Sequence, residues 1–155
     1  MTELLVSIRD LEKSYWLDGR EIPVLRGVSV DIAAGERISI IGRSGSGKST
    51  FLHVLGTLDT PSRGQVMFQG QDVFRRSSAE LASFRNRTVG FVFQFHHLLP
   101  EFSARENVMM PAMIQRMPTA QAIKQAEEML EIVGLSHRMR HRPGELSGGE
   151  QQRVA

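Results

Sequence analysis

The residues of this chain best suited to chemistry form one glycine-rich segment, Gly42-Arg43-Ser44-Gly45-Ser46-Gly47-Lys48-Ser49-Thr50. Its glycines let the backbone curl tightly, so that successive N–H groups can point inward at an anion. A β-branched run ends at Ile41 and a helical pattern begins at Lys48, and this strand–loop–helix order is what a phosphate-binding loop requires. The spacing predicts a nucleotide site, with Lys48 at the β- and γ-phosphates and the Ser49 hydroxyl on Mg²⁺.

A chance glycine-rich turn is the alternative to a phosphate-binding loop. At average residue usage the pattern arises by accident in roughly one chain of this length in two hundred. The strand–loop–helix context makes an accident rarer still. The loop by itself indicates no more than a nucleotide binder, because kinases, GTPases and motor ATPases share it.

A second anion-binding device lies about 100 residues further on, in the run Leu146-Ser147-Gly148-Gly149-Glu150. Read alone, Ser147 and Glu150 form the capping box of a helix. Two glycines in a first turn cost a helix up to ~1 kcal/mol each, so they are expected where the helix start lies against a ligand. Exposed N–H groups, a serine hydroxyl and the helix dipole together favour an anion there.

With both motifs present, the chain is identified as a member of the ABC ATPase family, whose signature the run LSGGE at 146–150 resembles. The resemblance covers the whole chain and implies ATP and Mg²⁺ as cofactors. It implies that Lys48 is catalytic and that two copies form a head-to-tail homodimer. In that dimer Ser147, Gly148 and Gly149 clamp the γ-phosphate in trans. The residues implied around the phosphates are Gly42, Ser44, Gly45, Ser46, Gly47, Lys48, Ser49 and Thr50.

Two further site residues follow from the resemblance. Tyr15 stands where the family places the aromatic ring that stacks on adenine, and the neighbouring Trp16 could compete for this role. Gln94 matches the Q-loop glutamine, a catalytic residue that contacts Mg²⁺ or the attacking water and senses the membrane partner. The alternatives are a packing aromatic residue and an ordinary surface glutamine.

Within the family, segments 58–61, 94–100, 106–111 and 141–143 resemble the ATPases of lipoprotein-releasing complexes in bacteria with outer membranes. The ATPases of macrolide-type exporters and of the cell-division complex share most of these motifs and stay as alternatives. A metal site at the adjacent His96 and His97 is less favoured than packing or partner contact, because no carboxylate cluster accompanies them.

The resemblance implies transmembrane permease subunits as partners, no nucleic acid, and a peripheral place on the cytoplasmic face of the bacterial inner membrane. Phe95, Leu98 and Leu99 are expected to dock a cytoplasmic helix of a permease subunit, unless all three belong to the core. An ABC ATPase that acts on nucleic acid or ribosomes is the hypothesis from another class. It is less favoured because the chain shows neither a long coiled-coil insertion nor paired domains.

The elements that position these residues alternate between strands and helices. This order predicts an α/β fold, a P-loop NTPase core with an N-terminal antiparallel β subdomain and a helical subdomain at about 100–155. Thr119 is expected at the cap of the clearest helix and Gly134 at its stop. Strands are predicted at 4–8, 24–32, 37–41, 65–68 and 89–93, and helices at 48–55, 79–85, 119–133 and from 147.

The length and composition of the chain are those of a single domain or of part of one. The chain has 155 residues, no cysteine and a net charge of +2, which excludes disulfides and thiolate metal sites and gives no sign of nucleic-acid binding. No signal peptide is recognised, and no apolar run approaches the ~20 residues that cross a bilayer. A membrane link is therefore expected through a partner.

The motifs that follow the signature in the family have no counterpart in residues 1–155. These are the Walker B strand with its Mg²⁺-binding aspartate and catalytic glutamate, the D-loop, and the switch histidine. The chain is thus expected to be a partial ABC nucleotide-binding domain, with its phosphate loop at 42–50, its Q-loop near residue 94 and the C-terminal part of the fold missing. A non-catalytic nucleotide-binding fragment is a further hypothesis for these residues taken alone.

Overall fold

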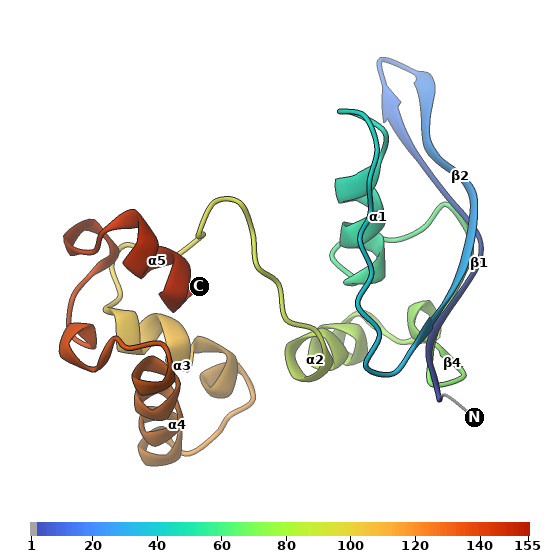
Figure 1. Ribbon diagram of the computed structural model, residues 1–155. Coiled ribbons are helices and arrows are strands. Elements are labelled where there is room, and N and C mark those ends of the chain that lie inside the picture. Colours follow the sequence, from blue (N-terminus) through green and yellow to red (C-terminus); the bar gives the residue numbers. More distant parts are fainter. Residues whose placement is uncertain (1–2) are drawn as a thin grey trace. The chain divides into compact units, whose positions relative to one another are not determined.

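The computed structural model describes residues 3–155 and divides into two compact units, Met1–Val89 and Gly90–Ala155 (Figure 1). The first unit carries the phosphate loop and the second carries residue 94 and the signature. Each unit has its own buried apolar clusters and is described by itself.

An antiparallel sheet forms the frame of the first unit, in the strand order β2-β1-β3-β4. Its long hairpin turns at Asp18 and Gly19, whose φ angles of 49° and 76° suit the tight turn that Asp-Gly pairs favour. Both strands of the hairpin extend several residues beyond the predicted ranges 4–8 and 24–32, because they continue to this turn. The strands are β1 (Leu4–Leu17), β2 (Arg20–Ala33), β3 (Arg63–Phe68) and β4 (Gln71–Asp72).

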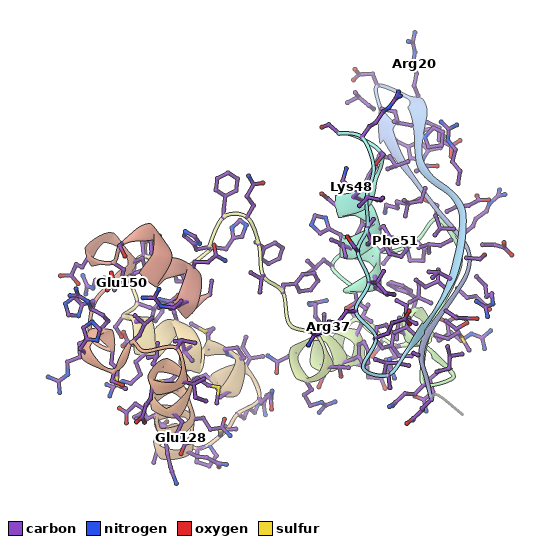
Figure 2. All side chains as sticks on the ribbon, viewed as in Figure 1. Arg20, Arg37, Lys48, Phe51, Glu128 and Glu150 are labelled. Carbon is purple, nitrogen blue, oxygen red and sulfur yellow. The ribbon has the colours of Figure 1, made fainter. Side chains whose placement is uncertain are left out.

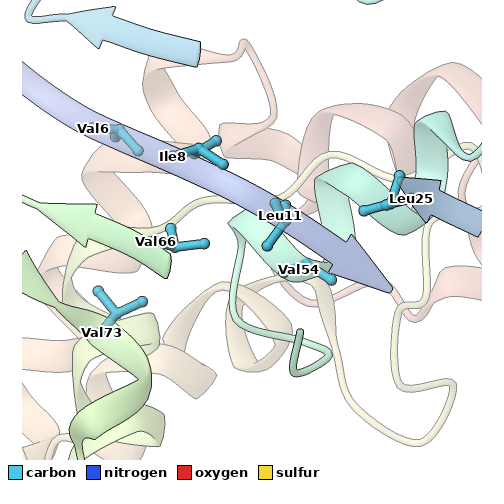
Figure 3. Packing of buried hydrophobic residues seen from close by; sticks show 7 residues of the cluster. All are labelled: Val6, Ile8, Leu11, Leu25, Val54, Val66 and Val73. Carbon is cyan, nitrogen blue, oxygen red and sulfur yellow. The ribbon is translucent and has the colours of Figure 1, made fainter. Parts of the chain in front are cut away.

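One face of this sheet packs against the helix that follows the phosphate loop, α1 (Lys48–Leu55). Val54 of α1 is fully buried against Ile8 and Leu11 of β1, as Figure 3 shows. The helix agrees with the predicted one, and the core behind it fixes the start of α1 relative to β1 and β2. The unit is completed by η1 (Val73–Arg75) and α2 (Ser78–Thr88).

The strands predicted at 37–41 and 89–93 are not formed in the part of the chain that the structure describes. A β-branched or aromatic run becomes a strand only when a neighbouring strand pairs with it. The ladders of the described sheet join β1, β2, β3 and β4 alone. As a result Ile41 is 89% exposed, although its sequence reads as the end of a buried strand.

The second unit is helical, and one of its helices escaped the sequence analysis. This is α3 (Ala104–Ile114), which begins with a capping box between Ser103 and Glu106. The Ser-x-x-Glu spacing at 103–106 was the signal for it. The other elements are α4 (Thr119–Ile132), η2 (Ser136–Arg138), η3 (Pro143–Glu145) and α5 (Gly148–Val154).

Helix α4 confirms the predicted helix and corrects its cap. Pro118, not Thr119, occupies the cap position, and no side chain caps the first turn. The predicted stop is confirmed, since Gly134 takes a φ of 74° that favours glycine. Within residues 3–155 no helix has the length and apolar character to cross a membrane.

Candidate nucleotide-binding site

The phosphate loop reaches α1 through a position that only glycine fills. Gly47 is the N-cap of α1 with a φ of 89°, in the left-handed region. A Cβ there would meet Val24 Cγ1 at 3.0 Å and Leu25 Cδ2 at 3.1 Å. The loop therefore lies directly on β2, and the first turn of α1 is held open toward solvent.

A hollow of about 470 Å³ lies over this first turn. Lys48 is half-buried at its wall, and its Nζ donates to the carbonyl oxygens of Gly42 at 2.9 Å and Arg43 at 2.7 Å (Figure 2). The ammonium group is thus aimed back into the loop, where a phosphate oxygen could replace the carbonyls. The hollow is lined by Val24, Ser44, Gly45, Gly47, Lys48, Ser49 and Thr50.

These lining groups fit a nucleoside triphosphate. A helix N-terminus and an ammonium group supply positive charge, and the exposed Ser49 supplies a hydroxyl oxygen of the kind that Mg²⁺ prefers. The carboxylates that can ligate a metal do not cluster here: among the described residues no group of three His, Asp or Glu side chains could hold an ion. His96 and His97 accordingly belong to no such group.

The side chain of Tyr15, on β1, is bonded to the turn that follows α1. Its Oη donates to Asp59 Oδ2 at 2.8 Å. Burial and the bond to Asp59 raise the pKa of Tyr15. Trp16 is 71% exposed and, as the next residue of a strand, points to the other face of β1. This arrangement favours Tyr15 over Trp16 as the ring near the loop.

Gln94, in the second unit, is exposed in the segment 94–100. Phe95 is 72% exposed, whereas Leu98 is partly buried against the core cluster that contains Leu130. The segment is therefore neither all core nor all surface. Asn107 of α3 fixes it, because its Nδ2 donates to the carbonyl of Leu99 at 3.2 Å and its Oδ1 accepts from the Leu99 N–H at 2.8 Å. Sequence reasoning assigned no role to Asn107.

The signature serine caps α5. The Ser147 hydroxyl lies 2.9 Å from Glu150 Oε2, and the Ser147 N–H donates to the same oxygen at 2.8 Å. Arg138 Nε donates to the other oxygen, Oε1, at 2.9 Å. The bonds from Ser147, followed by that from Arg138, lower the pKa of Glu150 to about 2. The predicted capping box is thus present, and Arg138 completes it.

The signature glycines have space around them. A Cβ at Gly148 would meet nothing within 4 Å, and one at Gly149 would only reach Arg153 Nη1 at 4.0 Å. Their own chain therefore gives no packing reason for two glycines in the first turn of α5. The start of α5 therefore leaves room for a ligand.

The family model described as "ABC transporter" matches residues 25–155. The chain belongs to the ABC transporter family. It is 62% identical over 151 residues to the lipoprotein-releasing system ATP-binding protein LolD of Myxococcus xanthus, covering 97% of this chain and 67% of that protein. The proteins of the same name from Syntrophus aciditrophicus and Geobacter metallireducens are 57% and 56% identical, with 68% and 67% of their lengths covered.

Solved ABC cassettes share the fold. A dimeric post-hydrolysis state of the ATP-binding cassette MJ0796 bound to ADP and Pi matches with a TM-score of 0.87 at 37% identity, over 97% of this chain and 66% of that one. A second dimeric structure of this ABC transporter cassette matches with the same TM-score at 36% identity. The predicted α/β ABC ATPase fold is confirmed, and the chain spans about two thirds of the length of these relatives.

The geometry of this ABC chain brings part of the predicted site together. The phosphate loop, Lys48, Ser49 and Tyr15 belong to the first unit. Gln94 and the signature serine belong to the second unit. Sequence reasoning missed Lys13 and Asp59, which hold Tyr15, and Asn107 and Arg138, which hold the segments of the second unit.

Proposed function

We propose that this chain is the nucleotide-binding part of an ATPase subunit that powers a lipoprotein-releasing ABC transporter. The observation that carries the ATPase role is the ammonium of Lys48, held in the loop hollow by two carbonyls that phosphate oxygens can replace. Support for lipoprotein release is the shared name of relatives that are 51–62% identical to this chain. The ATPases of macrolide-type exporters and of the cell-division complex remain the alternatives.

In this proposal Lys48 binds the β- and γ-phosphates and Ser49 ligates Mg²⁺, which neutralises charge on the phosphates during transfer. Backbone and side-chain groups from Gly42 to Thr50 hold the triphosphate. Tyr15 stacks on adenine, and Gln94 contacts Mg²⁺ or the attacking water. ATP is the substrate, and its hydrolysis is coupled to transport.

The signature acts in trans in a head-to-tail homodimer. Support comes from the open space at Gly148 and Gly149, because a γ-phosphate of the other copy would account for glycines that their own chain does not require. Ser147 would offer its hydroxyl to that phosphate. The related cassette was solved as a dimer with ADP and Pi, which agrees with a nucleotide-dependent dimer.

Permease subunits are the proposed membrane partners, and they hold the ATPase at the cytoplasmic face of the inner membrane. The exposed Phe95 and Leu99 of the segment 94–100 form the proposed docking surface, next to Gln94. Nothing in the charge or motifs of the chain supports nucleic acid as a partner. We also propose that residues 1–155 are one part of a single nucleotide-binding domain, with its helical subdomain at about 100–155.

Residues 1–155 taken alone are proposed to be inactive. Ser49 and Gln94 can contact Mg²⁺, but the motifs that supply the catalytic glutamate and switch histidine in the family have no counterpart here. P-loop enzymes depend on a group that positions the attacking nucleophile for their rate. Any nucleotide that these residues bind would therefore not be turned over.

Lys48→Ala in the native protein tests the ATPase role. Loss of the ammonium from the β/γ-phosphates should weaken ATP binding or turnover by orders of magnitude. Lys124→Ala is the matched control, because Lys124 is an exposed lysine of α4 whose ammonium lies 3.9 Å from Glu128 Oε1. Calorimetric titration and phosphate release measure both steps. Turnover in Lys48→Ala equal to that of the native protein would rule out the assignment.

A further inference from the structure

A buried ion pair lies behind the ring of Tyr15. Lys13 is only 9% exposed, and its Nζ donates to Asp59 Oδ1 at 2.6 Å and to the carbonyl of Thr60 at 2.7 Å. The Tyr15 hydroxyl donates to the other carboxylate oxygen of Asp59 at 2.8 Å. Since Lys13 and Tyr15 are two apart on β1, they share a face of the strand. One carboxylate therefore holds both side chains.

Asp59 is itself fixed to α1. The backbone N–H groups of Leu58 and Asp59 both donate to the carbonyl of His53, at 2.8 and 3.2 Å. This helix begins at Lys48, so the carboxylate that holds the Tyr15 ring is attached to the helix that starts at the phosphate loop.

The ring of Tyr15 is thus immobilised before any nucleotide arrives. Its hydroxyl is bonded at one end, and the Lys13 ammonium lies 4.9 Å from the ring centroid. The ring is nonetheless 39% exposed. A side chain that is already ordered loses less conformational entropy when a ligand binds to it.

We propose that Lys13 and Asp59 are positioning residues for the nucleotide, which hold the Tyr15 ring at a fixed place relative to the phosphate loop so that adenine stacks on it. The inference rests on the adenine-stacking role of Tyr15 in the proposed function. If Asp59 served only to join β1 to the turn after α1, its bond with Lys13 would be sufficient. Here the second carboxylate oxygen of Asp59 accepts a hydrogen bond from the Tyr15 hydroxyl. This bond gives the Lys13–Asp59 pair a function in nucleotide binding.

A double-mutant cycle in the native protein tests the proposal, with the affinity for Mg·ADP measured by calorimetry. Tyr15→Ala should weaken binding by about 5- to 150-fold, the range for one lost base–aromatic stack. Asp59→Asn should weaken it by about two- to tenfold, because a mobile ring has to be ordered on binding. In the Tyr15→Ala background Asp59→Asn should have no further effect, since no ring remains to be positioned.

The outcomes separate this inference from the proposed function. If Tyr15→Ala weakens binding and Asp59→Asn costs nothing, or costs the same in both backgrounds, the positioning role is overturned while the stacking role stands. If Tyr15→Ala binds Mg·ADP like the native protein, the stacking role fails and the inference fails with it. Loss of binding in Lys48→Ala would still support the nucleotide site.

Two more variants guard against misfolding. Tyr15→Phe removes only the hydroxyl and leaves the buried Lys13–Asp59 pair intact, so it should fold and show the same two- to tenfold loss. Native affinity in Tyr15→Phe overturns the proposal. Asp31→Asn is the matched control, because Asp31 forms an exposed pair with Arg9 at 2.7 Å in the same sheet. It should bind Mg·ADP like the native protein.

Discussion

Glu150 joins two segments of the second unit through one carboxylate. Oε2 accepts from the N–H and lies 2.9 Å from the hydroxyl of Ser147, and Oε1 accepts from Arg138 of η2. All these bonds favour the ionised carboxylate, which is why its pKa falls from 4.5 to about 2. The signature helix is therefore capped by a group that stays charged well into acid.

A lowered pKa gives a definite pH dependence of stability. Glu150 contributes stability that is fully present above about pH 4.5 and is lost as the pH falls through about 2. Glu150→Gln should lower the free energy of unfolding near neutral pH. Its difference in free energy of unfolding from the native protein should shrink as the pH falls from about 4.5 to about 2. Urea unfolding at a series of pH values measures this difference.

Glu128→Gln is the control for this experiment. Glu128 is an exposed residue of α4 that lies 3.9 Å from Lys124. Figure 2 labels both Glu128 and Glu150. An exposed pair of this kind contributes little, so the free energy of unfolding at neutral pH should change by less than about 0.5 kcal/mol. A difference for Glu150→Gln that stays constant down to pH 2 would contradict the role of the carboxylate.

The residues proposed to contact a ligand are marked by a local sequence pattern, but those that support them are not. Gly47, Lys48 and Ser49 lie within one short motif, so their spacing alone indicates their role. Asp59 is 46 residues from Lys13, and Arg138 is 12 residues from Glu150. Only the fold brings such partners together, and no local pattern in the sequence marks them.

At the scale of elements, helices that are marked by local sequence signals could be predicted. Strands that depend on a pairing partner could not. Helices α1 and α4 follow from their loop, their periodicity and the stop at Gly134. The Ser-x-x-Glu box at 103–106 was available but unused, so α3 was missed. The runs at 37–41 and 89–93 have strand composition, yet a strand also requires a neighbour, which composition does not supply.

The segment 94–100 divides into a core residue and surface residues, and this division can be tested. Phe95→Ser should weaken co-purification with the permease subunits and leave the melting temperature unchanged, because the ring is 72% exposed. Leu98→Ser should instead lower stability by about 1–3 kcal/mol, since Leu98 packs against the core. Pull-down of the permease subunits and thermal unfolding measure the two effects.

Ile132→Ser is the matched control for the docking surface. Ile132 is 75% exposed at the end of α4 and lies outside the segment. It should keep both the partner and the melting temperature. If Phe95→Ser unfolds, the ring belongs to the core. If the variant still co-purifies with the permease subunits, Phe95 is not part of the docking surface.

At the scale of the whole molecule, the first unit exposes a large apolar surface next to the phosphate loop. A hollow of about 400 Å³ lies there, and Ile38 and Ile40 along its wall are 48% and 37% exposed. Within the described residues the segment 37–41 pairs with no strand. Exposed apolar area of this kind normally packs against further structure or a partner.

Residues 1–155 expressed alone are therefore expected to fold poorly and to release no phosphate from ATP. Each large apolar side chain left in water forgoes about 1.5–3 kcal/mol, and a domain has a net stability of only about 5–15 kcal/mol. Several such losses would remove most of this net stability. We expect a broad thermal transition and binding of an apolar dye, measured beside the native protein. A sharp two-state melt would overturn the packing argument. Phosphate release that Lys48→Ala abolishes would overturn the chemical one, because it would show that these residues position the attacking water by themselves.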